Sequence, residues 1–101
     1  MDGIVQGKLE DLARLCGRHS VRRLELFGSA ARGQAAAESD LDFLVEFQEL
    51  SLGKRAMAYF GLLEGLQGLF GRPVDLVMTS AIRNPYFTES IRAARTLLYA
   101  A

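Results

Sequence analysis

The stretch from Arg22 to Phe47 decides the fold, and it reads RRLELFGSAARGQAAAESDLDFLVEF. Its first six residues alternate in polarity and place Leu24 and Leu26 on one face. Alternation of this kind has the period of a β-strand, so residues 22–27 are predicted to form the first strand. The rest of the stretch supplies a turn and a second strand, and the remaining elements are built around these two.

The second strand is predicted over residues 41–47, with Phe43, Val45 and Phe47 on one face and Asp42 and Leu44 on the other. Between the two strands, Gly28-Ser29 ends the first one. Serine is a typical residue at a helix start, so residues 29–35 are expected to form a short helix.

Outside this stretch the pattern alternates between helices and strands. Apolar residues at helical spacing predict a first helix over 4–18 and a long helix over 52–70. The core-facing residues predicted for the long helix are Leu52, Ala56, Tyr59, Leu63, Leu66 and Phe70. A third strand is predicted over 73–78, a last helix from Asn84-Pro85 through Arg95, and a short edge strand over 97–99. The expected class is α/β (α+β), a small mixed sheet with helices packed on it.

Length and composition limit the possible functions. The 101 residues predict one domain over 1–101, with twelve Lys and Arg balancing twelve Asp and Glu. This balance gives no overall attraction to nucleic acid or to an anionic membrane. One cysteine, Cys16, and one histidine, His19, exclude an internal disulfide and cysteine or two-histidine metal sites. No signal peptide is expected, and the predicted location is the cytoplasm.

Acidic residues on the predicted strands carry the candidate chemistry. Asp40 and Asp42 are two residues apart, which places both on one face of a strand at roughly 6.6 Å along the backbone. Buried carboxylates need a positive partner, and a hard divalent cation with oxygen ligands is a natural one. Asp75 is a similar single acid in an apolar run. Taken alone, Asp-x-Asp is equally compatible with a solvated strand edge.

The expected topology would bring these acids together. If the first two strands are antiparallel neighbours, Gly28-Ser29 and the two acids Asp40 and Asp42 meet at one end of the sheet. If the third strand is parallel to the second, with helix 52–70 as the crossover, Asp75 reaches the same end. Glycine lets the backbone approach a phosphate, and N–H groups at a helix start bind anions. The three acids would then lie beside a phosphate site.

The combined motif resembles a known family. Gly28-Ser29, ten further residues and Asp40-Leu41-Asp42 resemble the signature of nucleotidyltransferases of the DNA polymerase beta superfamily. The pattern is most similar to the minimal nucleotidyltransferases (MNT), whose Gly-Ser-x-Ala-Arg-Gly and Ser-Asp-x-Asp motifs are both present. The segment Gly71–Val77 (GRPVDLV) resembles the strand that carries the family's third acid, and the resemblance covers almost the whole chain.

The resemblance implies transfer of AMP from ATP to a hydroxyl, with pyrophosphate leaving. It implies that Asp40, Asp42 and Asp75 bind two Mg²⁺ ions, with Mn²⁺ as an alternative, and that Asp75 helps to deprotonate the acceptor. Gly28 and Ser29 would hold the triphosphate. Arg32 is a candidate phosphate contact, because a guanidinium matches phosphate in a bidentate manner. The implied partner is a HEPN ribonuclease toxin whose tyrosine is adenylylated, in a hetero-oligomer.

Other interpretations remain open at this level. Ser29 could act only as a helix cap, and Arg32 could form only a structural salt bridge. The chain could also neutralise a toxin by occlusion without catalysis, or transfer a nucleotide to an antibiotic. The intact set of acids argues against lost catalysis. Templated polymerisation is disfavoured because the sequence has no basic groove for a nucleic-acid duplex, and no membrane association is expected.

Overall fold

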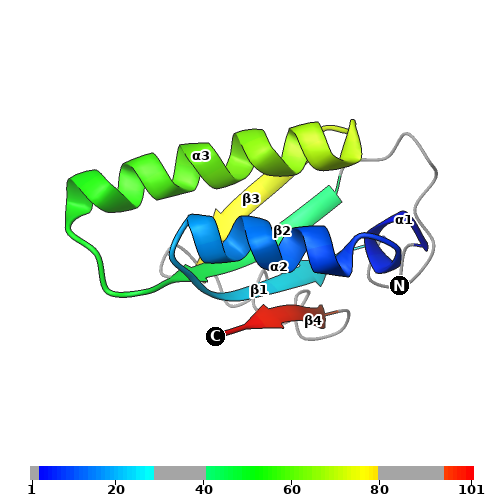
Figure 1. The fold of residues 1–101 in the computed structure, drawn as a ribbon, viewed down its shortest axis with the longest axis horizontal. Helices are drawn as coiled ribbons and strands as arrows, with labels where there is room; N and C mark the ends of the chain where they lie inside the picture. The colour runs from blue at the N-terminus through cyan, green and yellow to red at the C-terminus, as the bar shows by residue number, and fades with distance from the viewer. Residues whose placement is uncertain (1–2, 29–40, 80–94) are drawn as a thin grey trace.

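Four strands form one mixed sheet in the order β3-β2-β1-β4 (Figure 1). The computed structural model describes residues 3–28, 41–79 and 95–101. Strand β1 (Val21–Phe27) pairs antiparallel with β2 (Leu41–Phe47) and with β4 (Arg95–Ala100), whereas β2 and β3 (Val74–Met78) are parallel. The mixed sheet, the antiparallel first pair and the parallel third strand are therefore confirmed.

Helices cover one face of this sheet (Figure 1). Helix α3 (Leu52–Phe70) is the crossover between the parallel strands β2 and β3, which two parallel neighbours require. Helix α2 (Leu9–Arg18) packs beside α3 and against β1 and β4. Both helices contribute side chains to the same core, so the described residues form a sheet with a layer of helices on one side.

The N-terminal helix is interrupted, which corrects the single helix predicted over 4–18. The structure has a one-turn helix α1 (Gly3–Gln6), a turn at Gly7-Lys8, and then α2. Glycine inside a helix costs about 1 kcal/mol relative to alanine, so Gly7 is a favourable place for the break. Apolar residues keep their helical spacing across the turn, so the sequence pattern gave no sign of the break.

The main core lies between the helices and the sheet. Phe43 of β2 stacks on Phe70 of α3, with ring centroids 5.9 Å apart. Cys16 of α2 is fully buried in this core, and burial raises the pKa of its thiol to about 12. Full burial of one large apolar side chain stabilises a fold by roughly 1.5–3 kcal/mol. The other members of this core are Val5, Leu12, Val21, Leu24, Leu26, Leu41, Val45, Leu62, Leu66 and Leu76.

The buried face of α3 differs from the predicted one. Leu66 and Phe70 are buried as expected, but Leu52 is 81 % exposed and Ala56 is also exposed. Tyr59 and Leu63 are half-buried, and the most deeply buried positions also include Ala58 and Leu62. Apolar residues occur around most of this helix, so helical spacing alone admits more than one stripe. The position of the sheet selects which stripe is buried.

The predicted ends of the chain's last elements also need correction. Arg95 was expected to end a helix, but it is the first residue of β4. The edge strand predicted over 97–99 is present and extends over Arg95–Ala100. The third strand begins at Val74, since Pro73 has no N–H to donate to a strand pair. The short helix predicted over 29–35 and the helical residues 84–94 lie outside the described residues.

The face of the sheet opposite α2 and α3, here called the second face, carries a smaller apolar cluster together with charged residues. Phe27, Leu44 and Val77 form this cluster on three neighbouring strands.

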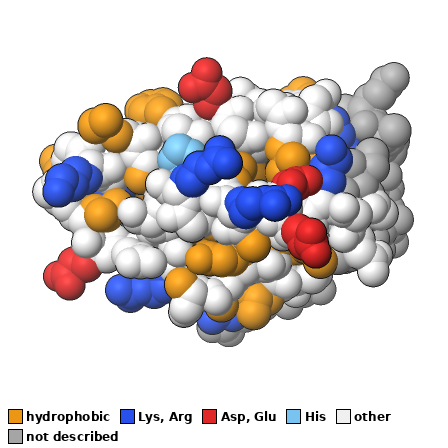
Figure 2. All heavy atoms as spheres, in the orientation of Figure 1, with side chains coloured by type: hydrophobic (Ala, Val, Ile, Leu, Met, Phe, Trp, Pro, Cys, Tyr) orange, Lys and Arg blue, Asp and Glu red, His pale blue; other side chains and the backbone are white. Residues whose placement is uncertain are grey.

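On the helical side, acidic and basic side chains are interspersed (Figure 2). Within the part of the chain that the structure describes, no helix is long and apolar enough to cross a membrane.

Candidate active site

Two of the predicted acids lie side by side on the second face. Asp42, the second residue of β2, is the register partner of Asp75, the second residue of β3. Neighbouring strands are about 4.8 Å apart, so both carboxylates belong to one small region. Asp42 is half-buried, whereas Asp75 is exposed to solvent. The parallel pairing of β2 with β3 thus brings together two acids that are 33 positions apart in the sequence.

Gly28 lies directly against Asp42. Its φ of 74° is in the left-handed region that side-chain-bearing residues rarely adopt. A Cβ atom at this position would be 2.7 Å from Oδ2 of Asp42, closer than van der Waals contact permits. Glycine is therefore required for both backbone conformation and space. The arrangement leaves the backbone of Gly28 beside a carboxylate with no side chain between them, which suits the close approach of a phosphate that is held through a cation.

The remaining predicted site residues lie outside the described part of the chain. These are Ser29, Arg32 and Asp40, and their roles stay predictions. Within residues 3–28, 41–79 and 95–101, no three acidic, histidine or cysteine side chains are grouped closely enough to hold a metal. The described residues thus supply two of the three expected ligands, Asp42 and Asp75. A pair of carboxylates with oxygen donors suits a hard divalent cation.

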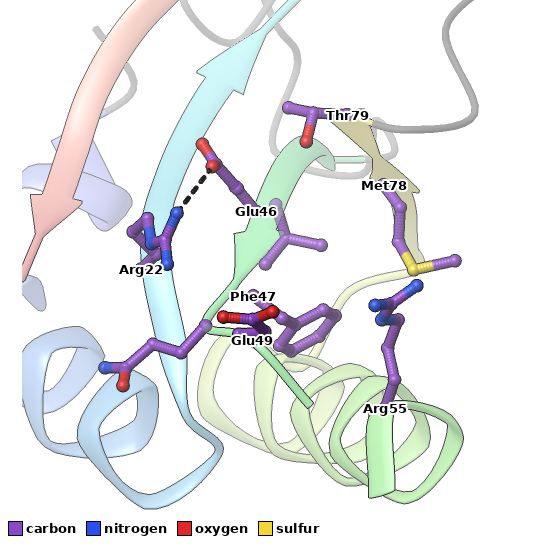
Figure 3. A pocket seen from close by; sticks show the side chains of 9 residues that line it. Arg22, Glu46, Phe47, Glu49, Arg55, Met78 and Thr79 are labelled. Carbon is purple, nitrogen blue, oxygen red and sulfur yellow. Dashed lines mark hydrogen bonds and ion pairs between the residues drawn. The ribbon is translucent and has the colours of Figure 1, made fainter. Parts of the chain in front are cut away.

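A cavity of about 500 Å³ lies at the other end of the same strands (Figure 3). It is lined by residues at the carboxyl ends of β2 and β3 and by Arg55 of α3, and Arg22 at its wall pairs with Glu46 at 3.5 Å. Val45, the lining residue nearest to Asp42 along β2, is three residues beyond it, about 10 Å along an extended strand. A ligand in this cavity would be too far from Asp42 and Asp75 to react there.

An ionic cluster on the second face was not predicted from the sequence. Glu25 of β1 is buried, with its side chain 5 % exposed, and its carboxylate accepts ion pairs from two arginines. Nε of Arg23 is 2.5 Å from Oε1 of Glu25, and Nε of Arg95 pairs with Oε2. A single acid between Leu24 and Leu26 is the same signal that singled out Asp75, and it could have identified Glu25.

Comparison with known proteins agrees with this architecture. The family model described as a nucleotidyltransferase domain matches residues 9–98. A Methanocaldococcus jannaschii protein, whose name assigns it provisionally as a protein adenylyltransferase, is 40% identical over 74 residues, which are 73% of this chain and 73% of that protein. A solved structure assigned provisionally as a minimal nucleotidyltransferase is 35% identical, with a TM-score of 0.67 and 94% coverage of both chains.

Two further solved structures share the fold at lower identity. A toxin–antitoxin complex with AMP-PNP has a TM-score of 0.70 at 20% identity, covering 92% of this chain and 73% of that one. An MNT antitoxin in complex with tri-AMPylated Shewanella oneidensis HEPN toxin has a TM-score of 0.65 at 18% identity, covering 96% and 73%. The acid pair, the glycine turn and the family match together lead to one conclusion: the chain belongs to the nucleotidyltransferase domain family, among its minimal nucleotidyltransferases.

Proposed function

We propose that this chain is a metal-dependent protein adenylyltransferase that transfers AMP from ATP to a tyrosine hydroxyl of a HEPN ribonuclease toxin and so acts as its antitoxin. The observation that carries the proposal is the register pair Asp42–Asp75 beside the glycine turn at Gly28. The names of the relatives support it, since they include protein adenylyltransferases and an MNT antitoxin bound to an AMPylated HEPN toxin. We place the reaction in the cytoplasm and the two proteins in a hetero-oligomer.

The reaction forms one bond and breaks another. The acceptor oxygen attacks the α-phosphorus of ATP, the bond from that phosphorus to the bridging oxygen breaks, and pyrophosphate leaves. Asp75 is exposed, so it can meet the incoming hydroxyl and accept its proton. Its strand partner Asp42 is half-buried and held against Gly28, which suits a fixed ligand.

The expected metal set is Asp40, Asp42 and Asp75, holding two Mg²⁺ ions, with Mn²⁺ as an alternative. Bound there, divalent cations would stabilise the charge on the attacking and leaving oxygens. Gly28 and Ser29 would hold the triphosphate through backbone and hydroxyl groups, and Arg32 would contact a phosphate. Because Asp75 is open to solvent, a macromolecular acceptor can bring its own hydroxyl to this end of the sheet.

The test is a mass measurement of the purified HEPN partner after incubation with the chain, ATP and magnesium. The wild type should add one or more AMP units, and the double variant Asp42→Asn/Asp75→Asn should add none. Glu46→Gln is the matched control, since Glu46 is an acid on the same strand and face, at the far end, where it pairs with Arg22. Full transfer by the double variant would contradict the proposal.

The same incubation distinguishes catalysis from occlusion. After mixing, the ribonuclease activity of the partner is measured with and without ATP. Neutralisation that requires ATP and both acids supports adenylylation. Neutralisation that is equally strong without ATP, and equally strong in the double variant, would replace the proposal with a binding antitoxin.

A further inference from the structure

The second face of the sheet is organised in rows that run across the strands. At the candidate-site end, Phe27 of β1 is the register partner of Asp42 on one side and of Arg95 on the other. Asp75 continues this row beyond Asp42. The row therefore reads Asp75, Asp42, Phe27 and Arg95 from β3 to β4, with Gly28 immediately after its third member.

Arg95 is held in place by a buried anion. Its Nε atom pairs with Oε2 of Glu25, whose side chain is only 5 % exposed. Burial of a carboxylate is unfavourable unless it is paired, so the pair restrains both partners. The side chain of Arg95 is nevertheless 41 % exposed. Because only Nε is used toward Glu25 in this pair, the outer N–H groups of the guanidinium remain donors for another anion.

Arg23 pairs with the same carboxylate, Glu25, but it lies farther from the candidate site. Its Nε pairs with Oε1 of Glu25, and its side chain is 46 % exposed, close to the value for Arg95. In register, however, Arg23 is opposite Glu46, four residues further from the glycine turn than Phe27. That is about 13 Å along the strand. The two arginines thus have the same ion-pair partner, Glu25, and differ in their distance from Asp42 and Gly28.

We propose that Arg95, positioned by Glu25, binds the β- and γ-phosphates of the nucleotide and the pyrophosphate that leaves. This inference rests on the proposed nucleotidyl transfer and names a residue for its leaving group. For the reaction, the α-phosphorus must lie at Asp42 and Asp75. The β- and γ-phosphates carry most of the negative charge of ATP and are attracted by a cation on the opposite side of Gly28. Arg95 is that cation, with its backbone about 10 Å from that of Asp42, two strands away.

The other described arginine near this end is less suited to the role. Arg72 precedes β3 by two residues and is buried, with 7 % of its surface exposed. The side chain of Arg95, in contrast, is exposed and is held by its ion pair with the buried Glu25. Arg95 also lies in the same row as Asp42 and Asp75. A guanidinium binds phosphate oxygens in a bidentate manner, which suits a polyphosphate.

The test compares three ligands by calorimetry in the presence of magnesium: ATP, pyrophosphate and AMP. Arg95→Ala should weaken binding of ATP and of pyrophosphate by about tenfold or more and leave AMP affinity unchanged, because AMP lacks the outer phosphates. Glu25→Gln should weaken the same two ligands, since Arg95 loses its charged anchor. Arg23→Ala is the matched control: it removes the other ion pair of Glu25 and should bind all three ligands as the wild type does.

The outcomes separate this inference from the proposed function. Failure of the wild type to bind ATP would contradict nucleotidyl transfer itself. Wild-type binding of ATP with unchanged ATP and pyrophosphate affinity in Arg95→Ala would overturn the role of Arg95 alone. An equal loss for AMP, or an equal loss in Arg23→Ala, would show a general structural effect and also overturn it. Thermal melts of Arg95→Ala and Arg23→Ala check that both variants are folded to the same extent.

Discussion

Replacing Gly28 by alanine should damage stability and nucleotide binding together. Two costs can be worked out from the structure. A side chain at φ 74° costs about 1–2 kcal/mol in the left-handed region. The added Cβ would also be 2.7 Å from Oδ2 of Asp42, so that carboxylate must turn away at roughly 0.5–1.5 kcal/mol for an off-rotamer side chain. Together these two costs should lower the free energy of unfolding by about 1.5–3.5 kcal/mol.

Gly71→Ala is the matched control for this change. Gly71 caps α3 with a φ of 62°, also left-handed, but a Cβ there would meet nothing within 4 Å. It should therefore cost only the conformational term, about 1–2 kcal/mol, and should not alter the site. The stability difference between the two variants isolates the contact with Asp42.

The assays are urea denaturation for stability and calorimetry with ATP and magnesium for binding. Gly28→Ala should be the less stable variant and should bind ATP at least about tenfold more weakly, because its Asp42 carboxylate has moved. Gly71→Ala should bind ATP as the wild type does. Equal stability of the two variants, with wild-type ATP affinity in Gly28→Ala, would refute the argument that Asp42 is held against the glycine turn.

Two further predictions concern the core. The folded chain should react very slowly with a thiol reagent at pH 8 and rapidly in urea, because burial raises the pKa of the Cys16 thiol to about 12. Since the unfolded thiol ionises at lower pH, the contribution of Cys16 to stability is present below about pH 8.5 and is lost as the pH rises toward 12. Over that range the free energy of unfolding of Cys16→Ala should therefore fall less than that of the wild type. Equal losses in the two proteins would contradict this. Tyr59→Phe should lower the free energy of unfolding by about 1–2 kcal/mol in urea denaturation, because the Tyr59 hydroxyl donates to the carbonyl oxygen of Leu76 at 2.6 Å; unchanged stability would show that water replaces this bond.

The strands could be predicted from the sequence because their signals are local. Two strands and their buried faces can be identified from short patterns. One pattern is the alternation around Leu24 and Leu26, and the other is the apolar pair Phe43 and Val45. Helix α3 was predicted with correct ends for a similar reason, since apolar residues recur at helical spacing from Leu52 to Phe70. The buried stripe of α3 was not predictable, because apolar residues such as Leu52 and Phe60 also occur on its exposed side.

The sequence by itself determined which residue types are available for the site: the acids Asp40, Asp42 and Asp75 and the turn Gly28-Ser29, all carried by short local motifs. Only the tertiary structure decided which side chains meet. The pairing of β2 with β3 sets Asp42 beside Asp75, and the pairing of β1 with β4 places Arg95 in the same row. These contacts join distant segments through strand register. Register depends on the packing of a whole sheet face rather than on any neighbouring residues in the chain.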